Sequence, residues 1–253
     1  MKHKDISHEP LFLENPAGNS AVIFIHGLMR SPRQFDKLAD VVFRQGHTAE
    51  SLLLPGHGGK AKDFGKGTFE RWQAHVDAEI ERLTQIYDGI RLVGHSIGGL
   101  LALNAAAKHV GHVRGVLTIA TPFKLTLLSP YSSKVRLRKL FLRKDDPIKN
   151  ALISTYSVTK SPSILWRAIE PTVEVKKLMA AARESLHKID VPVTAVYSSS
   201  DELTSLESLG ILSSGLSGAP FEQVLLSDSL HSYFPEHEQA MIEQALLKLL
   251  SRG

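Results

Sequence analysis

The stretch "RLVGHSIGGLLALNAAA", residues 91–107, contains the pattern that decides the fold. A short apolar run ends at Gly94, Ser96 follows, and Gly98 and Gly99 open a segment rich in leucine and alanine. This change from a strand-like to a helix-like pattern predicts a tight turn that exposes the serine, with small neighbours that let the two backbones approach closely. Glycine and serine are common residues, so the meaning of Gly94-x-Ser96-x-Gly98 depends on the rest of the chain.

The composition is typical of one compact globular domain. The chain has 253 residues, 43% of them hydrophobic, and a net charge of +4. It contains no cysteine, which excludes disulfides and thiolate chemistry. The first residues, "MKHKDISHEP", lack the apolar region of a signal peptide, and no apolar run is long enough to span a bilayer. We therefore expect a cytoplasmic protein without an integral membrane segment.

Strand-like and helix-like segments alternate along most of the chain. The helix-like segments are amphipathic and include residues 32–45, 69–87 and 236–250. Alternation of this kind predicts a mostly parallel sheet, here of about seven strands, with helices on both faces. The strand-like runs are short and apolar. They cover residues 11–14, 21–26, 49–55, 90–95, 115–120, 193–198 and 222–226.

The alternation stops between residues 122 and 188. This span has no convincing strand, but it contains helix-like stretches such as "TVEVKKLMAAARESLHKI". We interpret it as a helical cap inserted into a core formed by residues 1–121 and 189–253. Ligands of open α/β sheets bind at the carboxyl ends of the strands, which is where such an insertion is expected to lie.

A serine nucleophile needs hydrogen-bond donors for the negative charge that develops on the substrate oxygen. The residue after the serine, Ile97, can supply one backbone N–H from the start of its helix. The second N–H is expected from a loop after an early strand, and "AVIFIHGLMRSP" places Leu28 in such a loop. We therefore predict an oxyanion hole formed by the amides of Leu28 and Ile97.

The serine also needs a base and an acid, which should follow it in the order acid, then histidine. His231 lies between the last predicted strand and the last predicted helix, whereas His237 falls at the start of that helix. Asp201 ends a strand at the carboxyl side of the sheet, where catalytic groups gather. Glu202 and Asp228 remain alternatives for the acid. We predict that His231 is the base and Asp201 the acid.

These segments resemble the α/β-hydrolase superfamily, and within it the carboxylesterase and monoacylglycerol lipase branch, which is related to the serine aminopeptidase-like hydrolases. The resemblance rests on "FIHGLMRSP", "LLLPGHGG", "LVGHSIGGLLAL", "VYSSSDELT" and "SLHSYFPEH". It implies an acyl-enzyme on Ser96, with His231 as general base and Asp201 fixing the imidazole. It also implies that neither a metal nor an organic cofactor is needed. His57 in "PGHG" is interpreted as structural.

The substrate is expected to be a small carboxylic ester with a short to medium acyl chain, and monoacylglycerols are candidates. One alternative is a thioesterase whose anionic acyl carrier meets the basic stretch from Lys134 to Lys144, although we interpret that stretch in the first place as the solvated face of an amphipathic segment. Another is a binding or scaffold protein without turnover. No nucleic-acid-binding motif accompanies the positive charge. The sequence leaves monomer, homodimer and transient contact with a lipid surface open.

Overall fold

The structure is a computed structural model that describes residues 8–126, 146–158 and 167–252. The basic stretch from Lys134 to Lys144 and part of the predicted cap lie outside these residues. The elements are β1 (Leu11–Leu13), β2 (Ser20–Ile25), η2 (Pro32–Phe35), α1 (Asp36–Arg44), β3 (Thr48–Leu52), α2 (Ala61–Phe64), α3 (Phe69–Leu83), β4 (Gly89–His95), α4 (Ile97–Lys108), β5 (Val113–Ile119), α6 (Pro147–Thr155), α8 (Ile169–Ser185), η3 (Leu186–Lys188), β6 (Val193–Ser198), α9 (Glu207–Gly215), β7 (Phe221–Leu226) and α10 (Glu236–Ser251).

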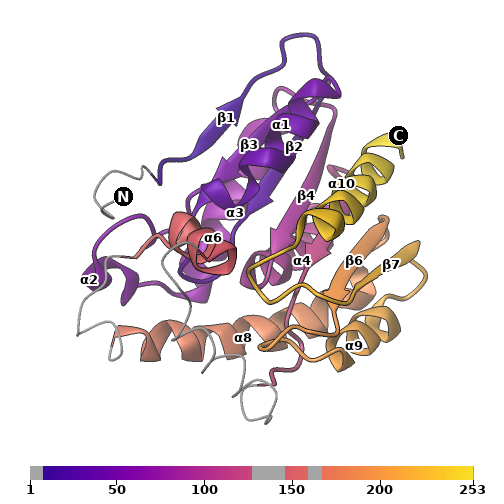
Figure 1. Cartoon of the computed structure of the whole chain (residues 1–253). Helices are drawn as coiled ribbons and strands as arrows, with labels where there is room; N and C mark the ends of the chain where they lie inside the picture. Colours follow the sequence, from indigo (N-terminus) through magenta and orange to yellow (C-terminus); the bar gives the residue numbers. More distant parts are fainter. Residues whose placement is uncertain (1–7, 127–145, 159–166, 253) are drawn as a thin grey trace.

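The centre of the molecule is a seven-stranded sheet in the order β1-β3-β2-β4-β5-β6-β7 (Figure 1). Every strand pair is parallel except β1 with β3, which is antiparallel. All seven predicted strands are present, which confirms a mostly parallel sheet. The edge strand β1 can run antiparallel because the connection from β1 to β2 needs no helical crossover.

Helices cover both faces of the sheet (Figure 1). In β2, Ala21, Ile23 and Ile25 belong to the apolar cluster shared with α3, α4 and α8. The residues between them, Val22 and Phe24, pack with α1 and α10 on the opposite face. This period of two follows from the alternating side-chain directions of a strand. Burial on both faces explains why β2 is an unbroken apolar run.

The helices agree with the predicted segments in position and differ in their ends. The segment at 32–45 divides into the 3-10 turn η2, which has Pro32 at its first position, and helix α1. Helix α3 begins after Thr68, whose hydroxyl accepts the N–H of Arg71, and it ends at Leu83 rather than at residue 87.

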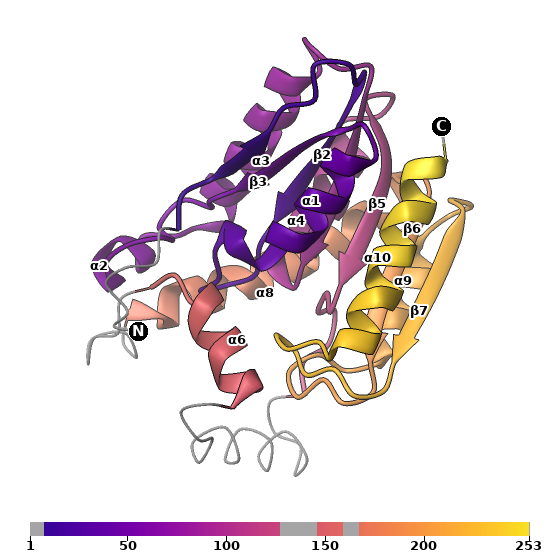
Figure 2. The same ribbon diagram turned by 45° about the horizontal axis from the view of Figure 1, so that its top comes forward.

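Two helices of the inserted span are described, and they have different surroundings. Helix α8 places Val175, Leu178 and Ala182 in the same apolar cluster as α4 and the sheet. Helix α6 begins after Asp146, whose carboxylate accepts the N–H of Ile148, and it lies against η2 next to the start of α1 (Figure 2). The division into a core and a cap at residues 122–188 stays a prediction. Within the described residues, α8 packs as a layer of the main core.

Within the described ranges, no helix has both the length and the apolar character that a membrane span requires.

Candidate active site

The turn between β4 and α4 holds Ser96 in a strained backbone conformation. Its φ of 55° and ψ of −119° lie in a region that a residue with a side chain rarely adopts, at a cost of about 1 to 3 kcal/mol. Small neighbours make the turn possible, because a Cβ on Gly98 would overlap the carbonyl oxygen of Ile25, and a Cβ on Gly99 would overlap Thr121. The predicted turn is therefore present, and strain at this residue is a feature typical of functional sites.

The structure brings Ser96, His231 and Asp201 together from three loops that follow β4, β7 and β6. The Oγ of Ser96 lies 3.0 Å from Nε2 of His231. The Nδ1 of His231 lies 2.9 Å from Oδ2 and 3.1 Å from Oδ1 of Asp201. With Nδ1–H donating to the carboxylate, Nε2 is an acceptor for the serine hydroxyl. This is the tautomer that can take a proton from Ser96.

The Asp201 carboxylate is held in its ionised form. Its Oδ1 accepts the backbone N–H groups of Leu203 and Thr204, each at 2.8 Å. Burial alone would raise the pKa of Asp201, but His231 and these two N–H groups outweigh burial and hold the pKa below its ordinary value. A carboxylate that stays charged can orient His231 and stabilise its protonated form.

The two alternative acids have other contacts. Glu202 is buried, and its carboxylate accepts the backbone N–H of His231 at 2.9 Å. Asp228 lies on the surface, 3.2 Å from Nε2 of His237. Asp228, His237 and Glu238 lie close enough together to suit a metal ion. The Glu238 carboxylate, however, already accepts the N–H groups of Ser227 and Asp228. Glu238 therefore fixes the loop that precedes His231.

The backbone of His231 is fixed at both of its polar groups. Glu202 holds its N–H, and the carbonyl oxygen lies 2.6 Å from Nε2 of His95. Burial lowers the pKa of His95 to about 3, so this ring is neutral and Nε2 carries its single proton toward the carbonyl. Sequence reasoning missed both contacts, although His95 stands beside Ser96 in the quoted motif and Glu202 beside Asp201.

The predicted oxyanion donors lie at the ends of β2 and β4. Among the described residues, neither the N–H of Leu28 nor that of Ile97 has a hydrogen-bond partner. The peptide between Gly27 and Leu28 is fixed from its carbonyl end, where the oxygen accepts Nδ1–H of His26 at 2.8 Å and the N–H of Arg30 at 3.0 Å. Because a trans peptide points its N–H away from its carbonyl, these bonds also fix the direction of the Leu28 N–H.

The loop continues through Met29, which has a φ of 59°. Its N–H donates to Nε2 of His57 at 3.1 Å, and burial lowers the pKa of His57 to about 4, which keeps this nitrogen available as an acceptor. His57 therefore contacts the oxyanion loop rather than the reacting groups. Burial also lowers the pKa of Arg30 to about 10, and its guanidinium donates to the Thr155 hydroxyl at 3.1 Å.

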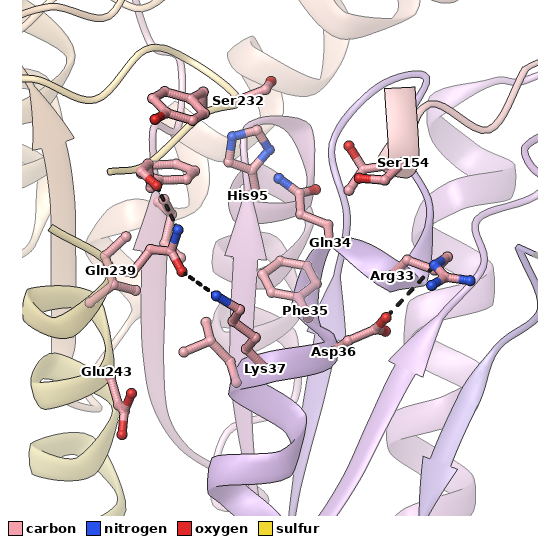
Figure 3. Close-up of a pocket in the computed structure, with 16 residues that line it drawn as sticks. Arg33, Gln34, Phe35, Asp36, Lys37, His95, Ser154, Ser232, Gln239 and Glu243 are labelled. Carbon is pink, nitrogen blue, oxygen red and sulfur yellow. Dashed lines mark hydrogen bonds and ion pairs between the residues drawn. The ribbon is translucent and has the colours of Figure 1, made fainter. Parts of the chain in front are cut away.

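A cavity of about 390 Å³ lies between η2, the start of α1 and α10 (Figure 3). His95 and Ser232, the sequence neighbours of Ser96 and His231, line one end of it (Figure 3). Lys37 and Gln239, joined by a hydrogen bond of 3.0 Å, lie between that end and Glu243 (Figure 3). Its volume is in the range of small-molecule sites. Its apolar wall consists of Phe35, Leu38, Ile119, Phe234 and Ile242.

A mostly parallel seven-stranded sheet with a serine at a strained turn after a central strand defines the α/β-hydrolase fold. The family described as "Serine aminopeptidase, S33" matches residues 17–238. The chain belongs to this hydrolytic family.

Two curated relatives match nearly the whole chain. A thermostable monoacylglycerol lipase of Bacillus sp. (strain H-257) is 26% identical over 249 residues, which cover 96% of this chain and 94% of the relative. A pimeloyl-[acyl-carrier protein] methyl ester esterase of Neisseria meningitidis is 27% identical and covers 89% of this chain and 91% of the relative. Their full-length matches show that the chain is similar to ester hydrolases along its whole fold.

Solved structures share the fold at lower identity. A structure of LipS and LipT, two metagenome-derived lipolytic enzymes, has a TM-score of 0.75 at 21% identity and covers 96% of this chain and 98% of that chain. The monoacylglycerol lipase of Paleococcus ferrophilus has a TM-score of 0.70 at 22% identity, with 97% and 99% covered. These similarities confirm the fold.

Proposed function

We propose that the chain is a serine hydrolase that cleaves carboxylic esters with short to medium acyl chains, monoacylglycerols among them. The observation that carries this proposal is the continuous hydrogen-bonded series from Ser96 through His231 to Asp201, with two backbone N–H groups beside it that have no partner among the described residues. The two curated relatives, both named as enzymes that act on esters, support the ester as the substrate class.

The proposed reaction begins when Oγ of Ser96 attacks the ester carbonyl and its proton passes to Nε2 of His231. Asp201 stabilises the imidazolium that forms, and the N–H groups of Leu28 and Ile97 bind the negatively charged oxygen of the tetrahedral intermediate. The same proton then passes from His231 to the leaving alcohol, which gives an acyl-enzyme.

Water completes the cycle. His231 removes a proton from the water molecule as the water attacks the acyl carbonyl. When the second tetrahedral intermediate collapses, His231 gives this proton to Oγ of Ser96 and the carboxylic acid is released. All acid and base steps are carried out by one imidazole whose orientation is held by Asp201. A protein that only binds ligands has no use for this arrangement, which argues against the scaffold alternative.

A series of nitrophenyl esters from acetyl to palmitoyl, beside monoacylglycerols and acyl-CoA thioesters, tests the proposed substrate class. We expect turnover of short and medium esters, and a rate for Ser96→Ala lower by about ten-thousandfold or more. Faster turnover of acyl-CoA than of every oxygen ester would identify a thioesterase instead. Ester hydrolysis at the parental rate by Ser96→Ala would contradict the proposal.

A further inference from the structure

The end of α6 and the segment that follows it are hydrogen-bonded to the oxyanion loop at several points, including the Tyr156 hydroxyl to Sδ of Met29 at 3.7 Å. The N–H of Ser157 donates to the carbonyl of Met29 at 3.0 Å, and its hydroxyl donates to the carbonyl of Arg30 at 2.6 Å. The guanidinium of Arg30 donates to the hydroxyl of Thr155 at 3.1 Å. Ser157 is buried, with 3% of its surface exposed. One serine thus binds two successive carbonyls of the loop.

These bonds continue toward the predicted oxyanion donor. The peptide between Met29 and Arg30 has its carbonyl bound by the N–H of Ser157 and donates its own N–H to the carbonyl of Gly27 at 3.0 Å. The Ser157 hydroxyl holds the next peptide through the carbonyl of Arg30, so both peptides that flank Arg30 are fixed. The carbonyl of Gly27 belongs to the same peptide as the N–H of Leu28, so the direction of one sets the direction of the other. The series leads from a residue of the inserted span to the amide that would bind the oxyanion.

Docking of the insertion does not explain why a serine stands at this position. The inserted span already packs on the core through the apolar side of α8, including Val175 and Leu178. The residue beside Ser157, Val158, packs with Ala61 and Phe64 in a small apolar cluster next to the same loop. Apolar contacts therefore hold the insertion on the core. The two hydrogen bonds of Ser157 also set the orientation of the oxyanion loop, because each orients one peptide plane of the loop.

We propose that Ser157 is a positioning residue for the oxyanion hole, through which the inserted span sets the direction of the Leu28 N–H. This inference rests on the proposed function, since an oxyanion hole has meaning only in a hydrolase that forms tetrahedral intermediates. An N–H that binds the oxyanion acts mainly in the transition state. A misdirected Leu28 N–H therefore lowers kcat and leaves KM nearly unchanged.

The test compares Ser157→Ala with Ser185→Ala. Ser157→Ala removes the hydroxyl that holds the carbonyl of Arg30 and keeps the N–H bond to Met29, so it loosens one of the two peptides that flank Arg30. Ser185 is a matched control in the same inserted span, because its hydroxyl also bonds across an interface, to Asn104 at 2.8 Å. For Ser157→Ala we expect kcat on a nitrophenyl ester to fall by about three- to tenfold, well below the loss of a whole oxyanion donor because the N–H bond to Met29 remains, with KM changed less than about twofold.

A trifluoromethyl ketone, which forms a tetrahedral adduct with a serine hydrolase, supplies a readout that a purely structural role would not change. Its affinity should fall by the same factor as kcat in Ser157→Ala and stay at the parental value in Ser185→Ala. Ser157→Cys, which keeps the shape of the side chain with a somewhat larger atom and a weaker donor, repeats the test with a smaller loss if the alanine variant does not fold. Thermal unfolding identifies the folded variants.

Three outcomes contradict the inference. A folded Ser157 variant with parental kcat and parental ketone affinity would overturn it. So would a lower kcat with unchanged ketone affinity, because the oxyanion hole would then be intact, and so would an equal loss in Ser185→Ala. If the parent chain itself shows no ester turnover and no labelling of Ser96 by a fluorophosphonate, the proposed function falls, and this inference falls with it.

Discussion

His231 and the oxyanion loop, the two sides of the proposed active site, are held by different parts of the chain. The contacts that fix His231 come from the ends of β4 and β6. Asp201 binds its ring, Glu202 binds its N–H, and His95, the last residue of β4, binds its carbonyl. The oxyanion loop is held by His26 at the end of β2 and, in addition, by His57 and Ser157, which lie outside the sheet. The proton-transfer groups are thus a property of the core, whereas the oxyanion donor is also coupled to the insertion.

This difference predicts unequal consequences of substitution. Changes around His231 should impair proton transfer directly, and changes around the oxyanion loop should lower transition-state binding by smaller factors. A coupling between Ser157 and Leu28 would let the inserted span adjust the donor that stabilises the oxyanion.

The largest effect is expected for Asp201→Asn, which keeps the shape of the side chain and removes its charge. The asparagine amide favours the wrong tautomer of His231, and kcat should fall by about a thousand- to ten-thousandfold. Steady-state kinetics with a nitrophenyl ester measures this loss.

Glu202→Gln is the matched comparison, because a glutamine oxygen can still accept the N–H of His231. We expect a loss of less than about tenfold for this variant. Equal losses in the two variants would contradict the separate roles that the geometry gives the neighbouring carboxylates.

Much of this arrangement could be predicted from the sequence, because local patterns carry it. The strand runs are short and apolar on both faces, and the order of Ser96, Asp201 and His231 follows from the order of the strands. The antiparallel pairing of β1 could not be predicted, since an apolar run contains no information about its partner. The packing of α8 in the main core was also missed, because an amphipathic helix does not show which surface it covers.

The contacts that position the reacting groups are the least predictable part. His26 and Ser157 meet the oxyanion loop through ring or hydroxyl bonds to backbone carbonyls, and such bonds leave no periodic pattern. Glu202 stands next to Asp201, and the sequence does not show which of the two carboxylates binds the ring of His231 and which binds its N–H.

A smaller effect, on stability, is expected from His57 on the oxyanion side. Its pKa of about 4 in the folded chain lies below the ordinary value of 6.5, so the unfolded chain binds a proton more readily. The stabilisation is present above about pH 6.5 and is lost as the pH falls toward 4. Between pH 7 and pH 5, this one residue should lower the free energy of unfolding by about 2 kcal/mol.

Urea unfolding at several pH values measures this dependence. In His57→Gln, the decrease in the free energy of unfolding between pH 7 and pH 5 should be about 2 kcal/mol smaller than in the parent, because the titrating ring is gone. His112→Gln, which replaces an exposed histidine, is the matched control. An unchanged slope in His57→Gln would show that this imidazole is not held neutral.

The most direct measurement of the central claim is mass spectrometry of the chain after reaction with a fluorophosphonate. We expect one adduct on the peptide that contains Ser96 and no adduct in Ser96→Ala, whose free energy of unfolding should stay within about 1 kcal/mol of the parent. A folded parent chain that remains unlabelled, or an adduct that persists in Ser96→Ala, would contradict the assignment of Ser96 as the nucleophile.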